Sequence, residues 1–247
     1  MANKNNKEHS NFNRLSILIQ QDGFSFYLHG VDQKSTLKYA KIEVSDLHLK
    51  INLTLFRKEL EEIFEHHPID YTKLIFANEL YSLVPKEFYS DEDKVDFIKY
   101  NVQLLPEDNI VSEYIEDLKA YFLFIPYMNY HNIIFDFVEE FDFTHSSKLL
   151  IEETHKSQDN SQQLLIVNVR QQQIDIIGYE ESSFKLCNTY SFDNEIDILY
   201  YILFCVEELN FDQEKVLIRL KIEEEEDWIE ILRNYISNVE IESKFEI

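Results

Sequence analysis

Glycine is scarce in this sequence: the 247 residues include three, Gly23, Gly30 and Gly178. Folds that bind nucleotides use glycine where backbone N–H groups must come close to phosphates, or where φ must be positive. Three glycines leave few places for such loops, and none follows position 178. The composition therefore argues against a nucleotide site built on glycine-rich loops.

Basic residues, cysteines and long apolar runs are also few. Lys and Arg total 23 against 47 Asp and Glu, a formal charge of −24, which disfavours nucleic acid or an anionic membrane as a partner. Cys187 and Cys205 have no CxxC partner and are expected to be small buried residues in a reducing compartment. The polar start "MANKNNKEHSNFNR" contains no signal-peptide stretch, and no run approaches the roughly 20 apolar residues of a bilayer span. We expect a cytoplasmic protein with a solvated acidic surface, a charge that is also compatible with a basic partner protein.

The first part of the chain is predicted to form three strands, a helix and a strand. Apolar alternation predicts strands at 14–20 and 24–29, joined by Asp22-Gly23. This pair favours a type I′ hairpin, in which both turn residues need φ > 0. The pattern then predicts a strand near 35–44, a helix within 52–67 and a buried strand at 73–78. The order is βββαβ.

The same order returns late in the chain. Strands are predicted at 163–170, 172–180 and 183–192, followed by a helix over 193–210 that is capped by Asp193, and by a strand at 215–220. A duplicated supersecondary unit indicates a fold without depending on any single residue.

The segments between the repeats are predicted to extend the first half. They comprise an extended stretch at 80–88, a helix at 91–101 with a Ser90–Asp93 capping box, a hairpin turning near Glu116-Asp117, a helix after Pro126, a strand at 141–145 and a helix at 146–155. The chain is therefore divided into a disordered tail (1–13), a first subdomain with additional βαβα elements (14–156), a linker (157–163) and a second subdomain (164–247).

The duplicated layout resembles the actin-like ATPase superfamily, an α/β, ribonuclease H-like fold that includes actin, sugar kinases and pilus-assembly ATPase-like proteins. The sequence is similar to an uncharacterised bacterial family with this fold, through "LSILIQQDGFSFYLHG", "FDFTHSSKLLIEE", "LLIVNVRQQQIDIIGYE" and "NEIDILYYILFCVEELN". The resemblance covers the chain from about residue 14 onward, and it implies two subdomains that flank a cleft.

The resemblance also implies where a nucleotide would bind. In active members each half opens with a hairpin of the form apolar-Asp-apolar-Gly-x-[ST]-[ST]. The Asp helps to hold Mg²⁺, and the Gly and hydroxyls let the turn wrap the phosphates. A Gly-Gly pair late in the second half lies against the adenosine.

The first hairpin departs from this pattern. In register, Leu18 takes the Asp position and Gln20 the Gly position. A leucine cannot organise a metal ion. Asp22 and Gly23 could serve only in a shifted frame, where the carboxylate would repel phosphates unless a cation intervened. We interpret them as turn residues.

The second hairpin and the adenosine site depart as well. Asn168 takes the Asp position and Arg170 the Gly position. An asparagine can coordinate weakly through its amide oxygen but brings no charge for Mg²⁺, and arginine is bulky where phosphate needs bare backbone. A late Gly-Gly pair is absent, since no glycine follows 178.

No other cluster predicts chemistry. His66 and His67 are adjacent on a helix and point in different directions, so they make a poor metal pair. Two charged groups are interpreted as solvated helix faces rather than sites: Glu152, Glu153 and His155, and Asp136, Glu139, Glu140 and Asp142. Five aromatic residues exceed what a thin core needs, so that some could form an apolar patch for a partner: Tyr200, Tyr201, Phe204, Trp228 and Tyr235.

The sequence thus predicts a non-catalytic protein-binding or scaffold module of actin-like fold, with no cofactor, no metal and no catalytic residue. The alternative is a divergent ATP-binding protein, ATPase or kinase that holds ATP with Mg²⁺ in the interdomain cleft through Asp22, Gly23 and Asn168. A third hypothesis is a homodimer formed through the aromatic surface.

Overall fold

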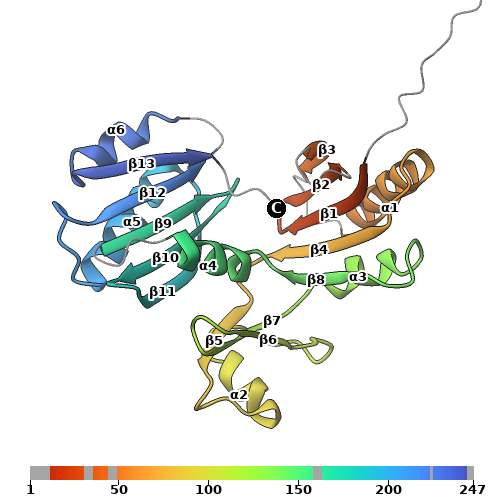
Figure 1. Cartoon of the computed structure of the whole chain (residues 1–247), viewed down its shortest axis with the longest axis horizontal. Coiled ribbons are helices and arrows are strands. Elements are labelled where there is room, and N and C mark those ends of the chain that lie inside the picture. The colour runs from red at the N-terminus through yellow and green to blue at the C-terminus, as the bar shows by residue number, and fades with distance from the viewer. Residues whose placement is uncertain (1–11, 31–35, 44–48, 158–162, 223–224, 244–247) are drawn as a thin grey trace, which may run out of the picture. The chain divides into compact units, whose positions relative to one another are not determined.

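The computed structural model of the chain describes residues 12–30, 36–43, 49–157, 163–222 and 225–243 (Figure 1). The predicted tail and linker lie for the most part outside these residues. Three sheets and their helices make up the fold, and two of the sheets repeat one another.

The first five-stranded sheet has the order β3-β2-β1-β4-β8. Its strands are β1 (Phe12–Gln20), β2 (Gly23–Gly30), β3 (Thr36–Glu43), β4 (Tyr71–Ala77) and β8 (Asp142–His145). Its helices, α1 (Leu49–His66) and α3 (Met128–Ile134), contact each other. Alternate apolar residues of β1 and β2 are buried, and the rings of Phe24, Phe26 and Phe56 meet at centroid distances between 5.2 and 5.7 Å.

The second five-stranded sheet repeats this order as β11-β10-β9-β12-β13. Its strands are β9 (Gln163–Val169), β10 (Gln173–Glu180), β11 (Ser183–Ser191), β12 (Leu217–Ile222) and β13 (Asn238–Ser243). Helix α5 (Glu195–Glu208) follows β11, and α6 (Trp228–Arg233) follows β12. Strand β12 runs parallel to both β9 and β13. The repeated unit is therefore βββαβαβ, one helix and one strand longer than the repeat that the sequence predicts.

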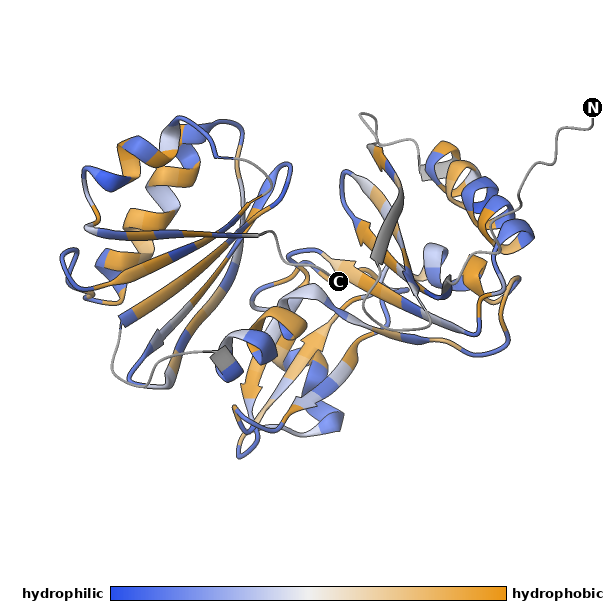
Figure 2. Cartoon of the chain, turned by 45° about the horizontal axis from the view of Figure 1, so that its top comes forward, coloured by the Kyte–Doolittle hydropathy of each residue, from blue (hydrophilic) through white to orange (hydrophobic). Residues whose placement is uncertain are grey.

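Helices cover both faces of the second sheet. Leu220 packs with α5 and α6 in a core that includes Trp228, whereas the next residue, Lys221, donates to Glu153 on α4 (Ser146–Ser157) at 2.9 Å. Successive strand residues point to opposite faces. Helix α4 therefore lies on the face opposite α5 and α6, as Figure 1 shows. The buried strands are hydrophobic along most of their length (Figure 2).

A small sheet is inserted between β4 and α3. It has the order β5-β7-β6, with β5 (Tyr81–Pro85), β6 (Val111–Ile115) and β7 (Ala120–Phe124). Helix α2 (Lys94–Ile98) packs on it around a core of Val84, Ile98, Leu123 and Ile125. The predicted hairpin near Glu116-Asp117 is confirmed as the β6–β7 connection.

The chain divides into two compact units. Among the described residues, the first holds 12–76 and 127–144, and the second holds 77–126 and 145–243. The inserted sheet and α4 thus group with the second five-stranded sheet, although both come from the first half of the sequence.

The predicted type I′ turn at Asp22-Gly23 is wrong. Gln20 pairs with Gly23, so the turn residues are Gln21 and Asp22, and neither has a positive φ. The register is set by the strands, because this pairing places the buried Ile19 opposite the buried Phe24. Positive φ at both turn residues occurs instead in the β10–β11 hairpin, at Glu181 (48°) and Ser182 (65°).

Two predicted helix caps are also wrong. Helix α5 is capped by Asn194 rather than Asp193: the Asn194 side chain accepts from the Ile196 N–H at 3.0 Å, and the Asp197 carboxylate accepts from the Asn194 N–H at 3.2 Å. Ser90 makes no cap hydrogen bond, because a 3₁₀ turn at Asp91–Asp93 precedes α2 and makes Asp93 itself the N-cap residue.

Candidate functional site

The hairpin between β9 and β10 carries the residues at the predicted phosphate position. The Arg170 N–H donates to the Gln173 carbonyl at 2.8 Å, which leaves Gln171 and Gln172 as the turn. Asn168 lies directly opposite Asp175. Their neighbours Val167, Ile174 and Ile176 pack toward α5 and α6, so Asn168 and Asp175 occupy the other face, where α4 lies.

Asp175 is completely buried, and its carboxylate accepts four hydrogen bonds. Oδ1 accepts from Arg170 Nη2 and Thr189 Oγ1, both at 2.8 Å, and Oδ2 accepts from Asn168 Nδ2 at 3.0 Å and Arg170 Nε at 3.1 Å. A carboxylate offers about four lone-pair sites. Every acceptor site of Asp175 is therefore used within the protein.

All three nitrogens of the Arg170 guanidinium also donate hydrogen bonds within the protein. Two of its nitrogens form a fork on Asp175, and Nη1 donates to the Ala77 carbonyl at 3.0 Å. Only 6% of the residue is exposed. Charge-assisted bidentate pairs of this kind fix geometry strongly. Arg170 therefore joins the hairpin to the end of β4.

A second layer of contacts joins the hairpin to the inserted sheet. Tyr81 Oη lies 3.0 Å from Thr189 Oγ1 and 3.4 Å from Cys187 Sγ. Because the Thr189 hydroxyl already donates to Asp175, Tyr81 is the donor to Thr189. Burial raises the pKa of Tyr81 well above its ordinary value and raises that of the Cys187 thiol to about 12. Neither group is an ionised nucleophile at neutral pH.

His145 is the last residue of β8, directly before α4, and the rings of Tyr81, Phe122 and Phe124 surround it at centroid distances between 5.1 and 5.5 Å. Burial lowers the pKa of His145 to about 3, so the imidazole is neutral at pH 7. Its Nδ1 accepts from the Ser147 N–H at 3.1 Å. Its Nε2 lies 3.3 Å from the Asn78 side-chain oxygen and 3.4 Å from the Asn78 backbone nitrogen, so both ring nitrogens contact polar groups of the protein.

These residues do not fit Mg²⁺ with ATP in the manner of the actin-like ATPases. A metal ion would need oxygen ligands with free lone pairs, and those of Asp175 are all engaged by Arg170, Asn168 and Thr189. Asn168 retains one unpartnered atom, Oδ1, which is buried and has no hydrogen-bond partner among the described residues. A single neutral oxygen is a weak metal ligand.

The first unit contains the corresponding hairpin in an apolar form. Leu18 lies opposite Ser25, and both are buried. Asp22 is half-buried in the turn, and Gly23 adopts a φ of 149° directly after it. Asp22 and Gly23 thus belong to the first unit and Asn168 to the second.

Three of the other charged groups singled out in the sequence have partners in the structure. His66 Nδ1 contacts the Glu62 carbonyl at 2.8 Å, Asp136 pairs with Arg57, and Asp142 accepts from the Tyr71 hydroxyl at 2.7 Å. Within the ranges that the structure describes, no group of three or more His, Cys, Asp or Glu side chains could hold a metal ion. Cys187 and Cys205 are free thiols.

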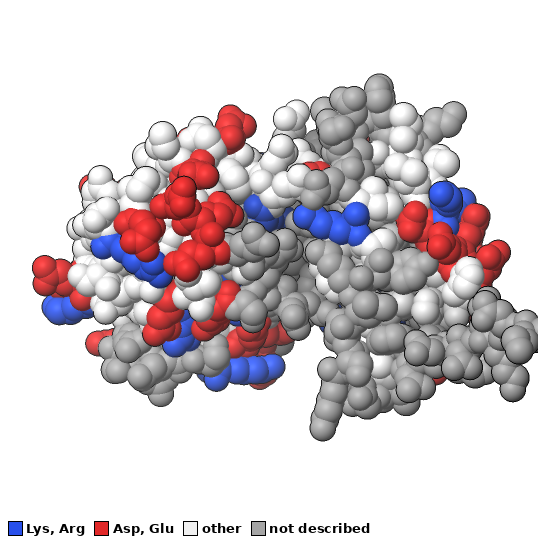
Figure 3. Space-filling view, turned by 90° about the horizontal axis from the view of Figure 1, so that it is seen from above, with Lys and Arg blue, Asp and Glu red and all other residues white. Residues whose placement is uncertain are grey.

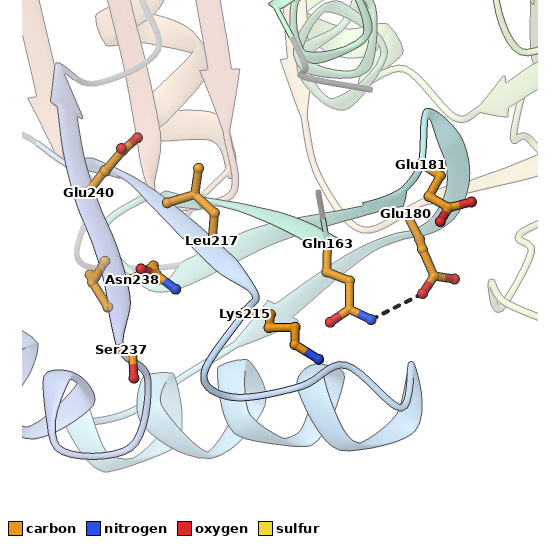
Figure 4. A pocket seen from close by; sticks show the side chains of 9 residues that line it. Gln163, Glu180, Glu181, Lys215, Leu217, Ser237, Asn238 and Glu240 are labelled. Carbon is orange, nitrogen blue, oxygen red and sulfur yellow. Dashed lines mark hydrogen bonds between the residues drawn. The ribbon is translucent and has the colours of Figure 1, made fainter. Parts of the chain in front are cut away.

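A cavity of about 740 Å³ opens at the far end of the second sheet, where β9, β12 and β13 begin (Figure 4). Its lining includes Gln163, Glu180, Lys215 and Asn238. Gln163 bridges its wall by donating to Glu180 at 3.1 Å and accepting from the Asp212 N–H at 2.8 Å. In open α/β sheets, ligands bind outside the carboxyl ends of the strands. This cavity lies at the amino ends, so the hairpin network is the stronger candidate site.

Sequence reasoning missed Asp175, Thr189, Tyr81 and His145. Asp175 could have been found, because it is a lone charge within the apolar stretch "QIDIIG" and a two-residue turn places it opposite Asn168. Tyr81 and His145 come from segments far away in the sequence, and no local pattern links them to the hairpin.

The sequence matches a family described as "Protein of unknown function (DUF3822)" over residues 2–239. The chain belongs to the DUF3822 family. Among solved structures, it is similar to a Bacteroides thetaiotaomicron protein with actin-like ATPase fold and unknown function, with 22% identity, coverage of 94% of this chain and 91% of that chain, and a TM-score of 0.78. It is also similar to a chain of the PilM-PilN type IV pilus biogenesis complex, with 8% identity, coverage of 94% and 88%, and a TM-score of 0.61.

These likenesses confirm the predicted actin-like ATPase fold. A search of curated proteins finds no match. None of the helices in the described ranges is long and apolar enough to cross a membrane.

Proposed function

We propose that this protein is a non-catalytic, protein-binding module of actin-like ATPase fold that acts in the cytoplasm. One observation carries the proposal. Active members of the fold hold Mg²⁺ and phosphates at the hairpin that corresponds to β9–β10. Here Arg170 forms a buried ion pair with Asp175 and donates two hydrogen bonds to its carboxylate.

The paired charges have a structural role in this account. Arg170 connects the hairpin to the Ala77 carbonyl, and Gln173 connects it to the Glu79 carboxylate at 2.7 Å. The hairpin could bind a phosphate through Arg170 only if the buried ion pair between Arg170 and Asp175 were broken. The apolar Leu18 at the matching position of the first hairpin supports the same conclusion.

The fold is compatible with a binding role. The PilM-PilN complex is an example of this fold within an assembly, although a shared fold alone does not transfer a function. The formal charge of −24 favours a basic partner protein over nucleic acid.

Isothermal titration of the purified chain with ATP and Mg²⁺ tests the proposal. We expect no saturable heat of binding, because Leu18 cannot bind a metal ion and the Asp175 carboxylate is fully engaged by Arg170, Asn168 and Thr189. Saturable binding at micromolar ATP would overturn the non-catalytic assignment.

A second candidate function is residual binding of ATP with Mg²⁺ through Asn168, Asp22 and Gly23. The unpartnered Oδ1 atom of Asn168 is the observation that favours it. This alternative predicts that ATP binding or turnover is measurable in the wild type and is lost in the Asn168→Ala variant. Absence of both in the wild type would exclude it.

A further inference from the structure

Helix α5 carries apolar side chains on two opposite faces. Ile198 and Ile202 are buried against the second sheet. Ile196, Tyr200 and Phe204, which recur every four residues and so line one face, are exposed by 75%, 58% and 38%. Residues two positions apart on a helix point in nearly opposite directions. We call Ile196, Tyr200 and Phe204 the α5 stripe. It faces away from the core, so packing within the second sheet does not explain why these residues are apolar.

The rings of the α5 stripe are held in place. Tyr200 and Phe204 stack with centroids 5.9 Å apart, and Tyr200 meets Tyr201 edge-on at 5.3 Å. Tyr201 in turn stacks on Tyr190 at 4.4 Å, and both pack against the buried core. A preorganised aromatic surface loses little conformational entropy when a partner binds.

A helix that is hydrophobic all round is normally buried on all sides. Exposed apolar patches on soluble proteins commonly mark sites of interaction. The neighbouring helix α6 packs on α5, and Ile231 of α6 and Tyr235, which follows its end, are exposed as well. Trp228 of α6 is fully buried and Tyr201 is partly buried, so of the aromatic residues singled out in the sequence, Tyr200, Phe204 and Tyr235 are the exposed ones.

The charges near the α5 stripe indicate which kind of partner could bind it. Residues 193–210 contain five carboxylates and no Lys or Arg. Asp193 and Glu195 lie at the start of α5, and Glu207 and Glu208 lie at its end. Figure 3, which looks down on the top of Figure 1, shows many Asp and Glu side chains and few Lys or Arg on the part that holds the second sheet. A second copy of the chain would bring the same carboxylates and another charge of −24 against this face.

We infer that the α5 stripe is the docking site for an apolar helical segment of another protein, with Lys or Arg at both ends of that segment. The two acidic ends, Glu195 and Glu207, are 12 residues apart, which is about 18 Å along the helix axis at a rise of 1.5 Å per residue. A partner helix of similar length would place its apolar face on the stripe and its cations on the carboxylates. This inference rests on the proposed protein-binding function and names the surface that carries it.

A fluorescent synthetic peptide tests the inference by anisotropy. The peptide forms a helix of about 18 residues with Leu on one face, Gln and Ala on the other, and two Lys at each end. A matched peptide carries Glu in place of Lys. We expect the Lys peptide to bind the full chain saturably and the Glu peptide to bind at least tenfold more weakly.

Variants separate stripe binding from general charge attraction. The Tyr200→Ser, Phe204→Ser double variant should lower the affinity for the Lys peptide at least tenfold, since aromatic anchors dominate such interfaces. The control is Phe88→Ser with Tyr100→Ser, two aromatic residues exposed by 65% and 82% near the inserted sheet, which should bind as the wild type does. Circular dichroism of each variant verifies that it is folded.

Three outcomes would overturn the inference: no binding of the Lys peptide, equal affinity of the stripe variant and the wild type, or a wild-type dimer in sedimentation equilibrium that the stripe variant dissociates. The last outcome would assign the face to a second copy. The ATP titration is independent of these results: ATP binding would overturn the non-catalytic function and leave the docking site intact, whereas failure of the peptide alone would overturn the docking site.

Discussion

The buried pair of Arg170 and Asp175 allows a quantitative prediction for the variant Arg170→Met. Methionine keeps most of the apolar volume but removes three side-chain hydrogen bonds, two to Asp175 and one to the Ala77 carbonyl. Removing one partner of a buried ion pair leaves an uncompensated charge and costs about 3–5 kcal/mol. We expect the second unit to lose about that much free energy of unfolding.

The assay uses the single tryptophan of the chain. Trp228 is fully buried in the core of the second sheet, so its fluorescence in a urea titration reports the unfolding of the unit that contains Arg170. The matched control is Arg233→Met in the same unit. Arg233 pairs with Glu225 and Glu230 at the surface, and its loss should change little.

A second variant tests the cause of the effect. Arg170→Met combined with Asp175→Leu removes both charges, and the double variant should be more stable than Arg170→Met alone, because no buried charge is then left unpaired. A loss below about 1 kcal/mol in Arg170→Met, or strict additivity of the two substitutions, would refute the reasoning.

Three further predictions use the same fluorescence assay. Burial lowers the pKa of His145 to about 3 in the folded chain, against about 6.5 in the unfolded chain. The contribution of His145 to the free energy of unfolding is therefore complete above pH 6.5 and falls by about 1.4 kcal/mol per pH unit toward pH 3. His145→Gln should show a shallower decline, and an unchanged slope would contradict the buried neutral imidazole. Asn194→Ala should cost about 1 kcal/mol by removing the cap of α5, whereas Asp193→Ala should have no such effect; the reverse order would restore Asp193 as the cap. Gly178→Ala should cost about 1 kcal/mol, because its Cβ would lie 2.8 Å from Leu209 Cδ1 and 3.2 Å from Leu165 Cδ2, so the ends of both side chains must shift, and a stabilised variant would contradict this packing.

Apolar alternation predicts most of the strands and helices, and the repeated order together with the resemblance to the actin-like superfamily predicts the fold. The strands around Leu15 and Ile166 and the helix around Ile198 were predicted because burial imposes a period of two on strands and 3.6 on helices. Local details were less predictable. Whether Asn194 or Asp193 caps α5 depends on the backbone turn before the helix, since both side chains can accept the bond.

The candidate site could be predicted only in part. The degenerate positions Leu18, Asn168 and Arg170 follow from register along a hairpin. The partner that gives Arg170 its role, Asp175, lies across the strand pair, and Ala77 is 93 residues away. The sequence pattern therefore shows that the motif residues are missing, but the contacts of Arg170 with Asp175 and the Ala77 carbonyl can be seen only in the structure.

We propose that buried protein contacts take the place of nucleotide binding at the β9–β10 hairpin. Isothermal titration of the wild-type chain with ATP and Mg²⁺ is the decisive measurement. We expect no saturable heat at any ATP concentration up to the millimolar range. A saturable isotherm in the micromolar range that disappears in Asn168→Ala would contradict it.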